Sequence, residues 1–256
     1  MNSFLLKQED MNMNKKTVLI TGASRGIGRA IALKFAEYGY HIFLNCSRSV
    51  SELEAVRSEI ENKPGASCDL FIGDVGDSSF VSEMFSHIYQ KCDSLDVLVN
   101  NAGIAYIGLL TDMTDEDWNH IIQTNLSSVF YCSRSAVPKM VSKKTGKIIN
   151  ISSMWGTVGA SCEVAYSATK SGIHGLTRAL AKELAPSNIQ VNAIACGCID
   201  TAMNSQLDAD ERFALEEEIP AGRFGTPQEI ADFVMHLVNS PAYLTGQIIG
   251  MDGGYI

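Results

Sequence analysis

The alternation of short β-rich runs with longer helical patterns is the feature that most restricts the fold of this 256-residue chain. The runs expected to form strands are Thr17–Thr21, His41–Asn45, Ser67–Ile72, Asp96–Asn100, Gly146–Ile151, Gln190–Ile194 and Gln247–Met251. Strand, helix and strand repeated in this way indicate parallel pairing with right-handed crossovers. We therefore expect the α/β class, with a doubly wound, Rossmann-type, seven-stranded parallel sheet and helices on both faces.

The segment between the first two runs illustrates the helical pattern. Its apolar residues recur at helical spacing, and a helix-ending glycine, Gly39, follows: Ile27, Ala30, Ile31, Phe35 and Tyr38. In a sheet of this kind, ligands bind beyond the carboxyl ends of the strands. The motifs described below all follow predicted strands or lie at the starts of helices.

The length favours a single domain. Residues 1–14 show no sustained periodicity and are expected to be a flexible N-terminal extension, so that residues 15–256 form one domain. Hydrophobic residues make up 46% of the chain and charged residues 19%, as in soluble globular proteins.

Charge and composition exclude several function classes. A formal net charge of −9 argues against a general nucleic-acid or anionic-membrane surface, and no apolar run is long enough to cross a bilayer. Seven scattered cysteines and five unclustered histidines favour reduced thiols without a metal site. We expect a cytoplasmic protein.

A glycine-rich loop follows the first predicted strand. It reads Thr21-Gly22-Ala23-Ser24-Arg25-Gly26-Ile27-Gly28 and leads into a helix whose first N–H groups favour a pyrophosphate. Gly22 permits the turn, Gly26 permits close approach of the phosphates, and Gly28 permits close packing of helix on strand. On its own, such a loop is also compatible with a purely structural turn.

A second motif pairs Tyr166 with Lys170. Residues four apart share one face of a helix, so the lysine ammonium can lie beside the phenol. A phenol normally titrates near pH ~10, and a neighbouring cation lowers its pKa, which makes proton transfer to a substrate oxygen feasible near neutrality. An isolated Tyr-x-x-x-Lys pair is more often an ordinary exposed pair, and its weight comes from occurring together with the other motifs.

These motifs, in this order, resemble the classical short-chain dehydrogenase/reductase family from about Lys16 to the C-terminus. The resemblance adds Ser153 and Asn125 to Tyr166 and Lys170 as a catalytic tetrad. Ser153 would orient the carbonyl, and Asn125 would hold a water next to Lys170. The cofactor-binding positions it implies are Gly22, Ser24, Arg25, Gly26, Ile27, Gly28, Arg48, Asp74, Val75, Asn101, Ala102, Gly103, Tyr166, Lys170, Ile199 and Thr201.

The resemblance is strongest to bacterial 3-oxoacyl-[acyl-carrier-protein] reductases. It implies NADPH-dependent reduction of a 3-oxoacyl thioester in fatty-acid biosynthesis, by a homotetramer. A reductase or dehydrogenase of a free ketone, steroid or sugar alcohol is the alternative of the same class, and a non-catalytic scaffold is the alternative of another class. The intact tetrad favours an enzyme.

The second predicted strand indicates the choice of cofactor. It ends in Asn45-Cys46-Ser47-Arg48, with no carboxylate to hold a ribose 2′-hydroxyl. Arg48 and Arg25 can instead flank a 2′-phosphate, which suits the guanidinium fork. We therefore expect NADP(H).

Two positions depart from the family pattern. Cys196 stands where the family has a proline, which is expected to loosen the nicotinamide-side loop modestly. Glu163 stands three residues before Tyr166, where related reductases carry a neutral amide, and it either bonds a substrate or faces solvent. Met154, Trp155, Tyr106 and Met203 are candidates for the apolar side of the substrate pocket.

An acyl carrier protein is acidic and would need a positive patch to dock. Such a patch could comprise Lys139, Lys143, Lys144 and Lys147. Lys144 stands where carrier-dependent relatives have a docking arginine, whereas Ser187 takes the place of a second one. The expected docking near Lys144 is therefore weak and sensitive to salt.

Overall fold

One parallel sheet organises the computed structural model, which describes residues 15–205 and 207–256. Its strands are β1 Thr17–Ile20, β2 His41–Cys46, β3 Ser67–Ile72, β4 Val97–Asn100, β5 Gly146–Ser153, β6 Ile189–Cys196 and β7 Ile248–Met251. Their order across the sheet is β3-β2-β1-β4-β5-β6-β7, and every pair is parallel. The expected fold class is confirmed, while the predicted extension at residues 1–14 lies outside the described residues.

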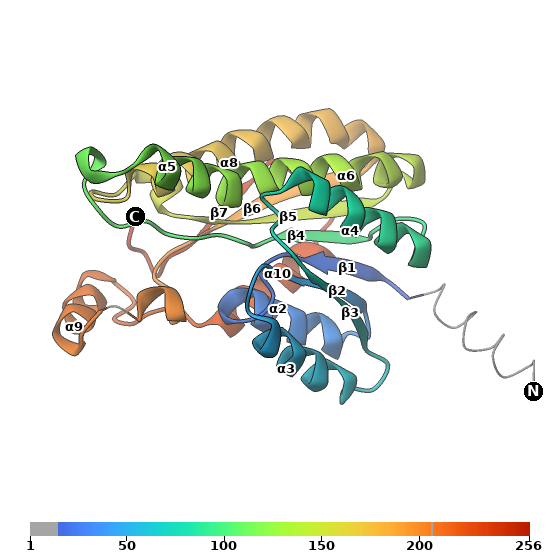
Figure 1. The fold of residues 1–256 in the computed structure, drawn as a ribbon, viewed down its shortest axis with the longest axis horizontal. Helices are drawn as coiled ribbons and strands as arrows, with labels where there is room; N and C mark the ends of the chain where they lie inside the picture. The colour runs from blue at the N-terminus through green and yellow to red at the C-terminus, as the bar shows by residue number, and fades with distance from the viewer. Residues whose placement is uncertain (1–14, 206) are drawn as a thin grey trace, which may run out of the picture.

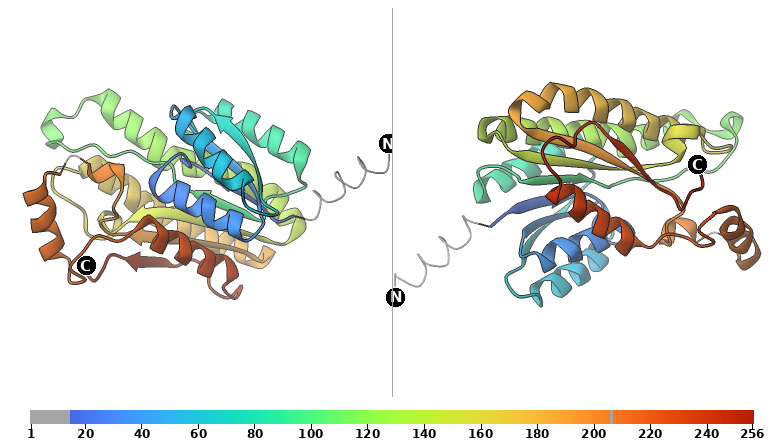
Figure 2. Two further views of the ribbon diagram at one scale, coloured as in Figure 1. Left: turned by 90° about the horizontal axis from the view of Figure 1, so that it is seen from below. Right: turned by 180° about the vertical axis from the view of Figure 1, so that it is seen from behind.

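Helices cover both faces of this sheet (Figure 1). They are α2 Gly26–Glu37, α3 Val50–Glu61, α4 Ser78–Lys91, α5 Asp115–Ile122, α6 Ser128–Lys143, α7 Trp155–Val158, α8 Val164–Leu184, α9 Ala209–Glu218 and α10 Pro227–Asn239. Helices α2, α3 and α10 lie on one face, and α4, α6 and α8 lie on the other. Two further views show α9 standing away from the sheet on the side of the C-terminus (Figure 2).

The core is divided between the two faces because successive strand residues point in opposite directions. In β1, Val18 and Ile20 pack with the α2, α3 and α10 side, whereas Leu19 packs with the α4 and α6 side. Burial of β1 on both faces explains why Val18, Leu19 and Ile20 are apolar in succession and do not alternate with polar residues.

Strands β5 and β6 are longer than predicted, and the extra residues position the site. They pair over their full length, up to Ser153 opposite Cys196. The expected catalytic serine is thereby fixed at the carboxyl end of the sheet, beside the strand that carries the unusual cysteine.

The first helix corrects one detail of the expected apolar stripe. Helix α2 ends at Glu37, and Tyr38, at its C-cap, is 56% exposed. Gly39 follows with a φ of +72°, the left-handed conformation that ends many helices. Tyr38 therefore belongs to the helix end and not to the buried stripe.

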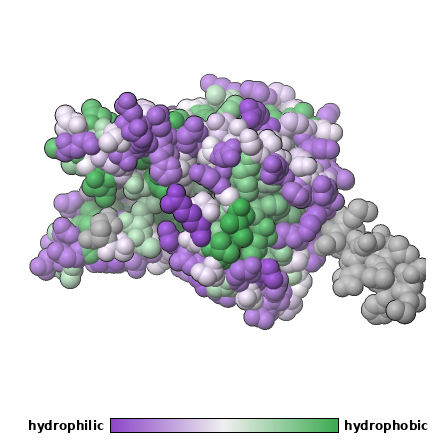
Figure 3. Space-filling model, viewed as in Figure 1, coloured by the Kyte–Doolittle hydropathy of each residue, from purple (hydrophilic) through white to green (hydrophobic). Residues whose placement is uncertain are grey.

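The outer surface is mixed. On the face seen in Figure 3, polar side chains cover much of the surface, and apolar side chains gather in smaller patches between them. None of the helices formed by residues 15–205 and 207–256 is long and apolar enough to span a bilayer.

Candidate active site

A cleft of about 600 Å³ lies beyond the carboxyl ends of the strands. It is lined by every residue expected to bind cofactor and by three of the four expected catalytic residues, Ser153, Tyr166 and Lys170. The glycine loop forms one end, and the start of α8 forms the other. Segments that lie far apart in the sequence thus meet at the carboxyl ends of the strands, as the parallel topology requires.

The glycine loop is shaped for close approach. Gly22 has a φ of +64° and Gly26 a φ of +54°, conformations that favour glycine. A Cβ atom on Gly28 would lie 2.2 Å from the Gly22 carbonyl oxygen, so only glycine fits there. The loop therefore leads directly into the amino terminus of α2, where free N–H groups can meet phosphates.

The loop after β4 holds the glycine loop in place. The Asn101 side-chain amide donates to the carbonyl oxygens of Thr21 (2.9 Å) and Gly22 (3.0 Å). The Thr21 hydroxyl accepts from the backbone N–H groups of Asn101 and Ala102, at 3.0 Å each. Asn101 lines the cleft, and its side-chain N–H groups bond backbone carbonyls of the glycine loop. It therefore holds the shape of residues 21–28, which we call the glycine cradle.

Two arginines line the far end of the cleft, where β2 ends. Arg25 lies 3.6 Å from the Glu52 carboxylate, an exposed ion pair. Arg48 lines the same end and, within the described residues, pairs with no carboxylate at ion-pair distance. Arg48 is therefore the more available of the two for an anionic group.

Tyr166 and Lys170 lie together in the buried wall of the cleft. The Lys170 ammonium is 5.4 Å from the centre of the Tyr166 ring and donates to the Ile151 carbonyl oxygen at 3.0 Å. Burial lowers the pKa of Lys170 to about 8. Helix α8 carries both residues, and its packing on β5 and β6 fixes them next to Ser153.

The pKa of Tyr166 differs from the sequence expectation. Burial raises it above the usual value near 10, although the Ser153 hydroxyl acts in the opposite direction. Burial is the dominant effect on this pKa, and the expected lowering by Lys170 does not appear. In this state Tyr166 is a neutral phenol, which is the form that can donate a proton.

Asn125 stands behind the cleft wall. It lies in a π-helical turn, Gln123–Ser127, inside the long helical segment, and it is completely buried. Its amide accepts from the Ile104 N–H (2.8 Å) and donates to the Ile104 carbonyl (2.9 Å). The side chain thereby holds the loop after β4, and the expected water beside Lys170 stays a prediction.

The substrate side of the cleft is largely apolar. Met154, Trp155 and Met203 line it as expected, whereas Tyr106 packs outside the lining, near Ile121 and Tyr166. Ile104 and Ile107, which follow the Asn-Ala-Gly loop after β4, also line the cleft and were not predicted from the sequence. Their position directly after a strand end was the signal that could have identified them.

The lysine patch expected to dock a carrier protein lies at the amino-terminal end of the strands, opposite to the cleft. Lys144 caps α6 just before the start of β5, whereas the cleft lies where β5 ends. Lys147 is not free to join the patch, because its ammonium donates to the carbonyls of Leu237 (3.2 Å) and Ser240 (2.8 Å). Lys139 lies over the Tyr89 ring, and Lys143 is 3.7 Å from Asp93.

Known proteins share this architecture over almost the whole chain. The putative gluconate dehydrogenase of Agrobacterium tumefaciens superposes with a TM-score of 0.89 at 35% identity, covering 96% of this chain and 97% of that one. YwfH, an NADPH-dependent reductase involved in bacilysin biosynthesis, has a TM-score of 0.89 at 28% identity, with coverages of 95% and 99%.

The proteins most similar in sequence among those compared share one description. The chain is 40% identical to the 3-oxoacyl-[acyl-carrier-protein] reductase FabG of Thermotoga maritima, covering 96% of this chain and 100% of that protein. It is 43% identical to FabG of Staphylococcus aureus, with coverages of 93% and 97%. Residues 16–212 match the family model described as short chain dehydrogenase. The chain belongs to the short-chain dehydrogenase/reductase family.

Proposed function

We propose that this protein is an NADPH-dependent reductase that converts a 3-oxoacyl thioester to the 3-hydroxyacyl form in fatty-acid biosynthesis. One observation carries the proposal: Ser153, Tyr166 and Lys170 line one end of a cleft whose other end is a glycine cradle. A carbonyl placed beside Ser153 and Tyr166 would share the cleft with a dinucleotide. The homotetramer and the cytoplasmic location expected from the sequence belong to this proposal.

The residues at the cradle fit a phosphorylated nicotinamide dinucleotide. The fit rests on Gly28, where any side chain would collide with the Gly22 carbonyl, and on the positive φ angles of Gly22 and Gly26. The N–H groups at the start of α2 would hold the pyrophosphate, and Arg48 would hold a 2′-phosphate. Ile199 and Thr201 line the nicotinamide side of the cleft. The bound cofactor supplies a hydride and is oxidised to NADP⁺.

The protein's own residues would orient the carbonyl and supply the proton. Ser153 donates a hydrogen bond to the carbonyl oxygen, which polarises the bond that is being reduced. Tyr166 transfers its phenolic proton to the same oxygen, which becomes the hydroxyl of the product. Lys170, held by the Ile151 carbonyl, lies beside the ring and stabilises the tyrosinate that remains. Solvent returns the proton to Tyr166.

The substrate assignment is supported by the curated relatives, at 39–43% identity over nearly their full length. A free ketone or sugar alcohol is the second candidate, because the structural neighbours include a putative gluconate dehydrogenase and a reductase of bacilysin biosynthesis. Absorbance of NADPH at 340 nm with an acetoacetyl thioester tests the proposal. Oxidation that requires the thioester supports it, and oxidation with free ketones only favours the second candidate. If NADPH were not oxidised with any carbonyl compound, the protein would be a non-catalytic scaffold of the same fold.

Docking of an acyl carrier protein near Lys144 is the finer part of the proposal. Lys144 is exposed, but its separation from the cleft and the engagement of Lys147 both favour a weak interaction. The test compares an acetoacetyl carrier with a short free thioester, at low and high salt, in wild type and Lys144→Glu. A carrier advantage that falls with salt and with the substitution supports docking. Equal kcat/KM for both substrates throughout would exclude it.

A further inference from the structure

Glu163 is an acidic residue in the wall of the cleft, and within residues 15–205 and 207–256 its carboxylate has no hydrogen-bond or ion-pair partner. It lines the cleft three residues before Tyr166, so that both side chains lie on neighbouring positions of the same helical turn. Among residues 15–205 and 207–256, the carboxylate makes no hydrogen bond to the helix end, and burial alone raises its pKa. A half-buried carboxylate that lines the cleft and has no protein partner keeps its hydrogen-bonding capacity for a ligand.

A structural role as a helix cap does not explain Glu163. It occupies the N-cap position of α8, but its side chain makes no capping bond. The other acidic N-caps do: Asp77 accepts from the Ser79 N–H, and Asp208 accepts from the N–H groups of Asp210 and Glu211. Glutamate is also not among the residues preferred at this position. The carboxylate is therefore left available to the cleft.

The turn before Glu163 is held in an unusual conformation. Cys162 has a φ of +63°, in the left-handed region that a residue with a side chain rarely adopts. Its carbonyl accepts from the Gly108 N–H at 2.9 Å, which ties this turn to the loop after β4. The backbone that presents Glu163 is thus fixed from two sides, and the carboxylate has a defined place in the wall.

Five charged side chains line the cleft: Arg25, Arg48, Asp74, Glu163 and Lys170. Its cations are Arg25 and Arg48 at the cradle end and Lys170, which is held by the Ile151 carbonyl. Glu163 lines the cleft, as do the apolar side chains of Met154, Trp155 and Met203, and the other acid of the lining, Asp74, follows β3. Within the described lining no cation faces Glu163 at ion-pair distance, so a positive group or a hydrogen-bond donor on the ligand would satisfy it.

We propose that Glu163 determines substrate specificity by favouring ketones that carry an ammonium group, or another strong hydrogen-bond donor, a few bonds from the reacting carbonyl. The same carboxylate disfavours ketones that carry a carboxylate there, because like charges repel. A neutral thioester is tolerated, since its amide N–H groups can donate to Glu163. This inference rests on the proposed reductase activity and concerns which ketones the same site prefers.

The test uses methyl ketones of equal chain length that end in an ammonium, a methyl or a carboxylate group. In the wild type, kcat/KM should be highest for the ammonium ketone and lowest for the carboxylate ketone. Glu163→Gln keeps the shape and removes the charge. It should lower kcat/KM for the ammonium ketone by about 10- to 100-fold, mainly through KM, while the methyl ketone changes by less than about threefold.

Glu183→Gln is the matched control. Glu183 lies on the last turn of the same helix, is exposed, and is about 30 Å from Glu163 along the helix axis. This substitution changes the net charge equally and should leave all three ketones unaffected. Equal kcat/KM for the three ketones, or an equal loss for all of them in Glu163→Gln, would overturn the inference. Absence of NADPH oxidation with every ketone and thioester would instead overturn the proposed function.

Discussion

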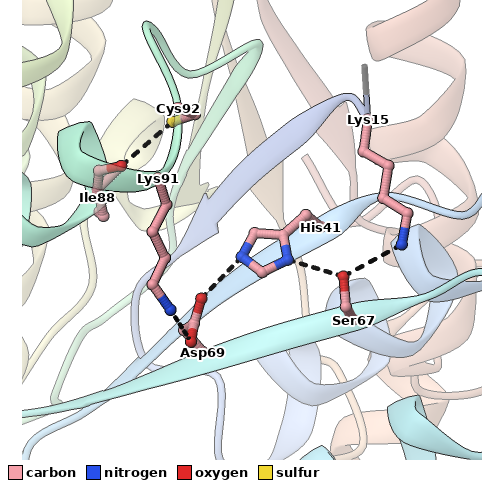
Figure 4. Close-up of polar contacts among 7 residues, drawn as sticks. All are labelled: Lys15, His41, Ser67, Asp69, Ile88, Lys91 and Cys92. Carbon is pink, nitrogen blue, oxygen red and sulfur yellow. Dashed lines mark hydrogen bonds and ion pairs between the residues drawn. The ribbon is translucent and has the colours of Figure 1, made fainter. Parts of the chain in front are cut away.

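Polar side chains at the two ends of the sheet differ in whether their hydrogen bonds are made within the protein. At the amino-terminal end, His41 is 8% exposed and lies between Ser67 and Asp69, with both ring nitrogens at 2.8 Å from a side-chain oxygen. Figure 4 shows this group, in which Lys91 also reaches Asp69 and Lys15 reaches Ser67. Every one of these side chains has a partner supplied by the protein.

At the carboxyl-terminal end, polar side chains line the cleft and keep hydrogen-bonding capacity for a ligand; among the described residues, Lys170 donates to a single acceptor, the Ile151 carbonyl. Tyr166 and Lys170 are 9% and 4% exposed, and the phenol faces the cleft. The Glu163 side chain makes no capping bond to α8, and no partner for its carboxylate is found among the described residues. Burying polar groups in this way is costly unless a ligand completes their hydrogen bonds. The comparison shows that one end of the sheet is built for stability and the other for a ligand, so substitutions should separate the two properties.

The largest expected effect is that of Tyr166→Phe. Removal of the phenolic hydroxyl should lower kcat about 10²- to 10⁴-fold, because it removes the proton donor and leaves the ring in place. The affinity for NADPH, measured by fluorescence titration, should stay within about twofold, and the melting temperature should not fall. A variant that keeps wild-type kcat at saturating substrate would show that another group donates the proton.

Arg48→Ala should change the choice of cofactor. Loss of a guanidinium that holds a 2′-phosphate should lower kcat/KM for NADPH about 10- to 100-fold and leave that for NADH nearly unchanged. Arg25→Ala should have a smaller effect, because Arg25 is already paired with Glu52. Kinetics with both cofactors decide the matter. If the wild type had equal kcat/KM for NADPH and NADH, Arg48 would not be the residue that binds the 2′-phosphate.

The sequence predicted the fold well because each strand is a short apolar run followed by a turn. Boundaries failed where polar residues continue a strand, as in β5, which extends through Ser152 and Ser153. Periodicity also placed Tyr38 in the buried stripe, whereas α2 ends one residue earlier. Hydrogen bonds to a neighbouring strand decide where a strand ends, and a single sequence does not display them.

The site was predicted in its residue types and less well in their electrostatics. Every cofactor position that the family resemblance implies lines the cleft, because the strand ends of a parallel sheet converge there, whereas the neighbouring lining residues Ser49 and Gly73 were not predicted. The motif spacing did not reveal that the side-chain amides of Asn101 and Asn125 bond backbone groups, or that burial raises the pKa of Tyr166. Those outcomes depend on tertiary packing.

Asp69→Asn tests the amino-terminal end. The hydrogen bond with His41, followed by that with Lys91, lowers the pKa of Asp69 to about 2. A carboxyl whose pKa is lower in the folded state stabilises the fold above its unfolded pKa, ~3.9, and this stabilisation is lost as pH falls through about 2. At pH 7 the variant should therefore lose about 2 kcal/mol of unfolding free energy and keep its kcat. The difference from wild type should shrink between pH 4 and pH 2.

The smallest effect should come from Lys91→Met, which keeps most of the apolar stem and removes the charge. Lys91 is 53% exposed, so its ion pair with Asp69 is screened by water and should contribute less than about 1 kcal/mol. Urea unfolding at 0.05 M and 1 M salt should show a small loss that disappears at high salt. Lys143→Met is the control, since its partner Asp93 is 90% exposed and 3.7 Å away. If Lys91→Met lost as much unfolding free energy as Asp69→Asn, Lys91 and not the buried His41 would be the main partner of Asp69. The stability of the amino-terminal end of the sheet would then depend on a surface charge.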